Sequence, residues 1–400
     1  MSTASERRAE AGERRAELLR PTWVEIDRGA FASNVDAIAS SLPAGSRLIA
    51  VLKADAYGHG AVELARVCRP ERVAMIATAL LEESLALRQA GIDLPLLVLG
   101  PMDDAAITAA VETRITPGIP GPEGLAAACR VAKARDVHVH LKLDSGMGRM
   151  GVTESELASV AAMIRGTPRL KIDALYTHFA NADDADDPFT EAQIAQFDRM
   201  IAALRAAGVE APLHHLANSA ATLRHLVRPG DFVRCGIALF GPGTSGGIAA
   251  GSAINADRRA ARAPGSLAAL GMRRPVMRWR TEIVRLKELP AGRAIGYGTT
   301  FHTTRPSRIA TLPVGYADGY SRLLSNRGDV LLRGRRVPVV GRVSMDLVTI
   351  DVTDVPEAAP GDEVVLLGDE ITAEELAAKT DTISYEVFCR VSRRVPRLYR

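Results

Sequence analysis

The sequence predicts an α/β protein with an N-terminal (β/α)8 barrel of the TIM type and a C-terminal domain of mostly antiparallel β-strands. Between residues 47 and 241, short apolar runs alternate with amphipathic stretches, which is typical of parallel strands joined by helices. Beyond residue 271, short β-rich runs are separated by Gly, Pro and Asp, which is typical of antiparallel strands and turns. With 400 residues, the chain is long enough for a barrel and a smaller companion domain.

Eight apolar runs of strand length occur in the first part, and this number favours closure into a barrel. The competing fold is an open doubly wound sheet, but no GxGxxG motif follows the first run. Several of the helical segments between the runs begin after Asp, Ser or Thr and end at Gly, as capped helices do. The eight runs are 48–53, 73–79, 96–100, 115–119, 137–143, 172–178, 213–218 and 232–240.

The second part carries six β-rich runs followed by two short helices. The runs are 276–286, 308–314, 330–332, 337–343, 347–352 and 363–367, and the helices are 373–380 and 385–391. We therefore predict four parts of the chain. They are a flexible N-terminal tail (1–20), the barrel (21–243), a Gly/Ala-rich insertion or linker (244–270) and the C-terminal β domain (271–400).

Charge and cysteine content exclude several classes of protein. The net charge of +3 gives no reason to expect nucleic acid or an anionic membrane as a partner. No apolar run is long enough to cross a bilayer, and the charge-rich residues 5–20 lack the apolar core of a secretory signal. The four cysteines lie far apart without a CxxC pair. We therefore expect no disulfide framework, no metal site and a cytoplasmic location.

Cationic and polar side chains gather at the carboxyl ends of the predicted strands, where barrels form their active sites. Lys53 closes the first run, and desolvation there would leave a neutral, nucleophilic amine. The alternative interpretation is a lysine that only extends its ammonium group into solvent. Other strand ends contribute Lys142, Arg149, His178, Asn218, Ser219 and Arg234.

The last two predicted strands indicate a phosphate site. Ser219 stands where a helix begins, and Gly236 lets the backbone come close to a ligand. The loops after strands seven and eight are the usual phosphate site of such barrels. A lysine amine opposite a phosphate pocket suggests a phosphorylated aldehyde held as an imine, which is pyridoxal phosphate.

From about Trp23 onward, the sequence resembles the alanine racemase family through motifs in both predicted domains. In the barrel they are Lys-Ala-Asp-Ala-Tyr-Gly-His-Gly (53–60), Asp-Ser-Gly-Met-Gly-Arg-Met-Gly (144–151), Thr-His-Phe-Ala (177–180) and Ala-Asn-Ser-Ala (217–220). In the β domain they are Gly-Tyr-Gly (296–298), Val-Gly-Tyr-Ala-Asp-Gly-Tyr (314–320), Val-Ser-Met-Asp (343–346) and Ser-Tyr-Glu-Val (384–387).

The resemblance implies a homodimer with shared active sites that interconverts L- and D-alanine and supplies D-alanine for peptidoglycan. It implies an external aldimine of pyridoxal 5'-phosphate and proton transfer by two bases. Lys53 matches the lysine that carries the cofactor and one of the bases, and Tyr297 of the partner subunit matches the other base. Arg234 matches an arginine that faces the pyridine nitrogen, where a permanent cation would disfavour protonation of the ring.

The remaining site residues are also expectations from the resemblance. The phosphate would be held by Tyr57, Ser219, Gly236, Ile237 and Tyr385, while His178 would hydrogen-bond Arg234 with Asn218 nearby. Arg149 and the backbone amide of Met345 would bind the substrate carboxylate. Lys142 matches a lysine that is carbamylated in many members and holds Arg149, and Tyr316 and Asp346 match residues that support the entrance.

Three other functions are alternatives to alanine racemisation. A racemase of the same fold could act on serine or more broadly, because an apolar wall rejects one extra hydroxyl only weakly. A non-catalytic pyridoxal-phosphate-binding protein would need neither Tyr297 nor the second domain. A decarboxylase would be expected to place an acid at the pyridine nitrogen, and Arg234 has the opposite charge.

Overall fold

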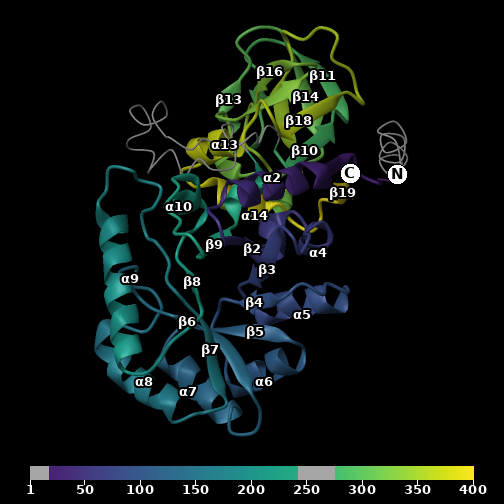
Figure 1. The fold of residues 1–400 in the computed structure, drawn as a ribbon. Helices are drawn as coiled ribbons and strands as arrows, with labels where there is room; N and C mark the ends of the chain where they lie inside the picture. Colours follow the sequence, from purple (N-terminus) through teal and green to yellow (C-terminus); the bar gives the residue numbers. More distant parts are fainter. Residues whose placement is uncertain (1–17, 242–274) are drawn as a thin grey trace.

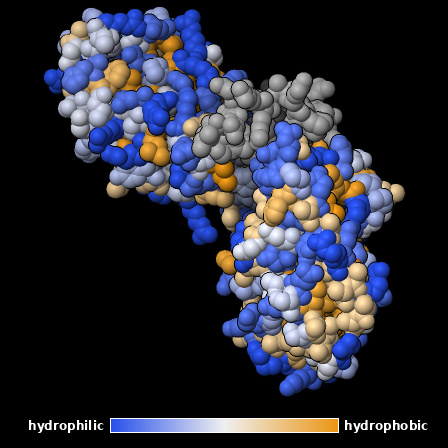
Figure 2. Space-filling view, turned by 90° about the vertical axis from the view of Figure 1, so that its left-hand side faces the viewer, coloured by the Kyte–Doolittle hydropathy of each residue, from blue (hydrophilic) through white to orange (hydrophobic). Residues whose placement is uncertain are grey.

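The computed structural model describes residues 18–241 and 275–400, which form two lobes. In Figure 1 the barrel lobe lies at the bottom and the β domain at the top, and the side view in Figure 2 shows the same two lobes set at an angle. The predicted insertion, 244–270, and most of the predicted tail, 1–20, lie outside the described residues.

Eight parallel strands form the sheet of the lower lobe in the order β8-β7-β6-β5-β4-β3-β2-β9. A backbone hydrogen bond of 2.9 Å from Arg234 N to Ala217 O links β9 to the segment that follows β8. The predicted barrel is thereby confirmed as a nearly closed parallel sheet. The strands are β2 (Arg47–Val51), β3 (Val73–Thr78), β4 (Leu96–Val98), β5 (Ile115–Ile119), β6 (Val137–Lys142), β7 (Leu170–Tyr176), β8 (Leu213–His215) and β9 (Phe232–Cys235).

Helices connect these strands and cover the outside of the sheet (Figure 1). Their polar caps and apolar faces explain their positions. Asp103, for example, caps α6 by accepting a hydrogen bond from Ala106 N at 2.8 Å, and the same helix buries Ile107 and Ala110. The helices are α2 (Arg28–Ser41), α4 (Ala61–Ala65), α5 (Leu81–Gln89), α6 (Asp104–Glu112), α7 (Pro122–Val131), α8 (Leu157–Arg165), α9 (Phe189–Ala206) and α10 (Ser219–Leu223).

The upper lobe is mostly antiparallel, as predicted. Its larger sheet has the order β16-β15-β18-β10-β1-β19, and a second sheet has the order β11-β14-β17. The strands are β1 (Thr22–Ile26), β10 (Met277–Glu282), β11 (Arg285–Leu289), β14 (Ser307–Leu312), β15 (Asp329–Leu332), β16 (Arg335–Pro338), β17 (Val348–Asp351), β18 (Glu363–Leu367) and β19 (Arg397–Tyr399). A small hairpin, β12 (Ala294–Ile295) and β13 (Phe301–His302), lies between β11 and β14 in the chain, and helices α13 (Ala373–Lys379) and α14 (Ser384–Arg390) lie between β18 and β19.

The first strand differs from the expectation that residues 21–243 build the barrel. β1 pairs with β10 on one side and with β19 on the other, so it belongs to the sheet of the β domain. Both edges of β1 are therefore paired within the sheet of the β domain. In the barrel, β2 has β3 and β9 as its neighbours. Arg20, placed in the flexible tail by the sequence, donates to Asp318 Oδ1 and Oδ2 at 2.7 and 2.8 Å.

Several predicted strands are shorter than expected, and two of them, β9 and β2, bear on the site. β9 ends at Cys235, and after Gly236 the chain forms a short 3-10 helix, Ile237–Phe240. β2 ends at Val51, so Lys53 is not a strand residue. In the described parts of the chain, no helix is long and apolar enough to span a bilayer, and no cluster of three His, Cys, Asp or Glu side chains could hold a metal ion.

Candidate active site

A cavity of about 540 Å³ opens at the carboxyl ends of the barrel strands. Its lining brings together the predicted residues of the barrel lobe with one from α14, although they come from distant parts of the sequence. They are Lys53, Tyr57, Lys142, Arg149, His178, Asn218, Ser219, Arg234, Gly236, Ile237 and Tyr385.

Lys53 begins α3 (Lys53–Gly58), a turn with an uncommon backbone. The four residues after Lys53 all have φ between 52° and 54° and ψ between 41° and 49°, which is left-handed helix. This conformation costs roughly 1–2 kcal/mol per residue for L-amino acids, so surrounding contacts must hold it. Glu83 Oε1 accepts from Ala54 N at 2.6 Å, and Asp55 Oδ1 accepts from Ala61 N at 2.8 Å.

The cavity is strongly cationic. Lys53, Lys142, Arg149 and Arg234 line it, whereas Asp183 is the one acidic residue among the described lining. Desolvation, and then the charge of Arg149, lowers the pKa of Lys53. Desolvation together with Arg149 and Arg234 lowers the pKa of Lys142 to about 8. The site therefore suits anionic ligands and can hold Lys53 as a neutral amine.

Arg234 is 4% exposed and donates in several directions at the cavity floor. Its two terminal nitrogens donate to the Nδ1 atoms of His215 at 2.7 Å and of His178 at 3.2 Å, and to the carbonyls of Thr177, His215 and Leu216. Its Nε–H has no acceptor among residues 18–241 and 275–400. Burial and nearby cations hold the pKa of His178 and His215 well below 6.5, so both rings are neutral acceptors.

Another part of the cavity lining consists of side-chain hydroxyls and of backbone that lies close to them. A Cβ on Gly236 would lie 2.2 Å from Tyr57 Oη, so only glycine fits beside that hydroxyl. Ser219 Oγ accepts from Gly236 N at 3.0 Å, which fixes the two loops together. The ring of Tyr385 lies 5.9 Å from that of Tyr57. Burial raises the pKa of both phenols, that of Tyr385 to about 12, so both are hydrogen-bond donors.

These two ends fit pyridoxal phosphate. A phosphate group requires hydrogen-bond donors, and phenol hydroxyls and nearby backbone N–H groups are such donors. The free Nε–H of Arg234 is the donor that an unprotonated pyridine nitrogen requires. Lys53, on the lining of the same cavity, supplies the amine that an aldehyde requires.

A second group of predicted residues does not line this cavity. Tyr297, Tyr316 and Met345 lie on loops of the β domain and are 73%, 43% and 53% exposed. Two of these loops are joined by backbone hydrogen bonds of 3.0 Å, from Tyr316 N to Ser344 O and from Ala317 N to Met345 O. Glycines on both sides of Tyr297 have positive φ, which lets this side chain project from the surface.

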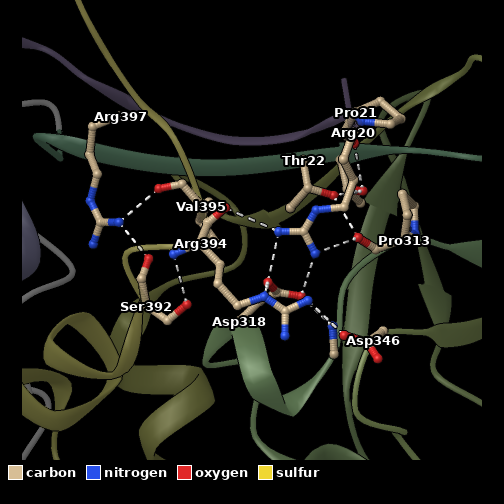
Figure 3. A network of polar contacts seen from close by, with 12 residues as sticks. Arg20, Pro21, Thr22, Pro313, Asp318, Asp346, Ser392, Arg394, Val395 and Arg397 are labelled. Atoms are coloured by element: carbon tan, nitrogen blue, oxygen red, sulfur yellow. Dashed lines mark hydrogen bonds and ion pairs between the residues drawn. The ribbon is translucent and has the colours of Figure 1, made fainter. Parts of the chain in front are cut away.

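Three other residues of the site were not assigned from the sequence. His215 is visible as a strand-end histidine, but only the fold shows that it supports Arg234. Asp318 is fully buried and binds Arg20, and Arg394 contacts both Asp318 and the predicted support residue Asp346 (Figure 3). Asp318 lies in the Gly-Tyr-Ala-Asp-Gly-Tyr motif, and this is the only feature of the sequence that indicates the network.

Comparison with known proteins identifies the family. The model of the N-terminal domain of alanine racemase matches residues 26–243, and the model of its C-terminal domain matches residues 276–399. An alanine racemase of Halothermothrix orenii is 39% identical over 389 residues, which cover 96% of this chain and 98% of the relative.

The chain belongs to the alanine racemase family.

Solved structures agree with this assignment. Alanine racemase from Streptomyces lavendulae has a TM-score of 0.86 and 34% identity, covering 96% of this chain and 98% of that one. Alanine racemase from Bartonella henselae, solved with covalently bound pyridoxal phosphate, has a TM-score of 0.81 and 26% identity, covering 95% and 99% of the two chains. The chain is thus a pyridoxal-phosphate-dependent amino-acid racemase, an isomerase of alanine.

Proposed function

We propose that the enzyme racemises alanine with two bases from different subunits of a homodimer, Lys53 of one protomer and Tyr297 of the partner subunit. The observation that carries the proposal is the division of the site residues into two groups. Lys53 lies on the cavity lining, whereas Tyr297 projects from the β domain and is absent from that lining. A second copy of the chain could bring the exposed loops of its β domain to the cavity mouth and complete the site.

Two bases are needed because racemisation removes a proton from one face of a planar centre and returns one to the other face. A single side chain held on one face cannot readily do both. We assign one face to Lys53 Nζ, whose lowered pKa favours the free amine that accepts a proton. We assign the other face to Tyr297 Oη, a hydroxyl on a short rigid turn (Tyr297–Thr299).

Other residues bind and orient the reactants. The bound cofactor supplies an aldehyde for the amino group of the substrate and a ring that withdraws electrons from its Cα–H bond. Arg149 binds the substrate carboxylate from the cavity side, and the Met345 amide of the second chain binds it from the other side. Tyr57, Ser219, Gly236, Ile237 and Tyr385 hold the phosphate. Tyr316 and Asp346 support the entrance.

The experiment that tests this assignment is subunit mixing. Lys53→Ala and Tyr297→Phe proteins should each be nearly inactive, because each lacks one base at every site. After subunit exchange at equal concentrations, about half of the dimers would be mixed, and each would hold one intact site, so about a quarter of wild-type activity should return.

A double variant, Lys53→Ala with Tyr297→Phe on one chain, is the matched control when mixed with wild type. Every site of that heterodimer lacks one base, so heterodimer formation should add no activity. If the single variants form heterodimers without regaining activity, the two bases do not meet across an interface. Assays with L-alanine and L-serine in parallel decide how strictly the enzyme selects its substrate.

We also place the enzyme in the cytoplasm, where it would supply D-alanine for peptidoglycan. All four cysteines (Cys68, Cys129, Cys235 and Cys389) are free thiols, and a reducing compartment maintains this state.

A further inference from the structure

A row of buried imidazoles continues behind Arg234, away from the cavity. His215 at the end of β8 is fully buried, and His140 on β6 is 3% exposed. His140 Nδ1 lies 3.0 Å from His215 Nε2, and His215 Nδ1 lies 2.7 Å from the Arg234 terminal nitrogen. His140 is not part of the cavity lining, and no step described above uses it.

The protons in this row can be placed by elimination. Arg234 has only donors, so His215 Nδ1 must accept and carry no proton. A neutral imidazole has one N–H, so His215 carries its proton on Nε2 and donates it to His140. His140 Nδ1 must then be the acceptor. The row therefore runs in one direction, from Arg234 through His215 to His140.

We propose that His140 is a positioning residue for the reaction: its Nδ1 lone pair accepts the Nε2–H of His215 and so stabilises the His215 tautomer that accepts from Arg234. The inference rests on the proposed function and on the fit, described for the cavity, of the Arg234 Nε–H to the pyridine nitrogen of the cofactor. If His140 could not accept, the buried Nε2–H of His215 would have no partner, and its tautomer or ring position would change. Arg234 would then lose one of the acceptors that hold its terminal nitrogens.

The surroundings support a fixed row. The ring of Tyr176 stacks on His215 with an interplanar angle of 11° and a centroid distance of 4.6 Å. The Arg234 guanidinium carbon lies 5.4 Å from the centroid of the same Tyr176 ring. Burial lowers the pKa of His140 to about 4, so it remains a neutral acceptor at physiological pH.

Substitutions that keep or remove the acceptor test the proposal in the cofactor-loaded enzyme. His140→Leu removes the lone pair, whereas His140→Asn retains an amide oxygen at the position of Nδ1. The control is His138→Leu on the same strand, because His138 is exposed and pairs with Asp173 instead. Imidazole ¹⁵N resonances report the His215 tautomer directly, and steady-state kinetics separate kcat from KM.

We expect wild type and His140→Asn to show an Nε2-protonated His215 whose Nδ1 accepts a hydrogen bond. In His140→Leu the Nδ1 resonance should move, toward that of a protonated nitrogen where the tautomer changes, or toward that of an unprotonated nitrogen without a hydrogen bond where the ring moves. Its kcat should fall about tenfold, the effect of one hydrogen bond, while KM stays within about twofold because Arg149 is untouched. His138→Leu should behave as wild type.

An unchanged His215 spectrum in His140→Leu overturns the proposal, and so does an equal loss of kcat in the Leu and Asn variants. These outcomes leave the proposed function intact if subunit mixing restores activity to the Lys53→Ala and Tyr297→Phe proteins. If subunit mixing restores none, the proposed function fails, while the spectra still show whether His140 stabilises the tautomer.

Discussion

Lys142 shows how neighbouring charges decide what a single side chain can do. Its amine lies close to two guanidinium groups, those of Arg149 and Arg234, and both lower its pKa in addition to burial. A carbamate on this amine would replace a third cation by an anion and would hold Arg149 in place. The sequence resemblance suggested this modification, and the electrostatics of the cavity favour it.

Carbamylation of Lys142 should therefore depend on pH. Only the free amine adds carbon dioxide, and a pKa of about 8 in place of 10.5 makes about half of the amine free at pH 8. With ¹³C-labelled bicarbonate, a carbamate resonance should appear and grow as the pH rises through this value. Lys142→Ala should abolish the resonance, and Lys171→Ala on the exposed side of β7 should not. A carbamate signal that persists in Lys142→Ala would refute the assignment.

At the residue scale, the sequence predicted which side chains of the barrel lobe gather around one cavity, because the family motifs contain them. It did not predict the acceptors behind Arg234. His140 and His215 are separated by 75 residues, and only the pairing of β6 and β8 with the two edges of β7 brings them together. For a histidine on an apolar strand, the sequence does not tell whether the ring accepts a hydrogen bond that supports another side chain or only packs in the core.

The left-handed turn in α3 shows how far an element can depart from its local preference. Ala-Asp-Ala-Tyr has no glycine, and such a sequence normally prefers a right-handed helix or a strand. The sequence therefore predicted Lys53 at the end of a strand. Long-range contacts from Glu83 and from Arg397, which donates to Gly58 O at 3.2 Å, oppose that preference. These contacts cannot be read from the segment itself.

A glycine in this turn should stabilise the protein, contrary to the usual effect. In Ala54→Gly, relief of roughly 1–2 kcal/mol of left-handed strain should exceed the 0.5–1 kcal/mol of added unfolded-state entropy. The net gain should be about 0.5–1 kcal/mol, seen as a higher urea midpoint. Ala126→Gly in the right-handed α7 is the control and should lower the midpoint. Equal losses in both variants would mean that the turn is not strained.

At the scale of the whole molecule, residues 392–397 connect the two lobes. Arg397 reaches the turn that presents Lys53, while Arg394 binds Asp318 and Asp346 beside the exposed loops of Tyr316 and Met345 (Figure 3). The domain order and the barrel followed from the sequence patterns. This connection did not, because arginines in a charged segment predict only a solvated surface.

Loss of the buried Asp318 carboxylate should reduce the free energy of unfolding more than loss of an exposed carboxylate. Asp318→Asn keeps the shape but leaves Arg20 and Arg394 without a buried counter-charge, and it should reduce the free energy of unfolding by about 2–4 kcal/mol. Asp354→Asn removes the exposed partner of Arg305 and should reduce the free energy of unfolding far less, because solvent screens that pair. Urea unfolding of both proteins provides the measurement, and similar losses would show that Asp318 is not structurally important.

The position of β1 has a consequence for synthesis on the ribosome. This strand leaves the exit tunnel early, yet its partners β10 and β19 follow only after the entire barrel has been translated. The hydrogen bond from Arg28 N to Arg400 O, for example, joins residues 372 positions apart. The nascent chain must therefore expose two unpaired edges of an apolar strand throughout translation of the barrel, and such edges readily pair with other chains. A chaperone that holds unfolded chains would bind at these unpaired edges of β1.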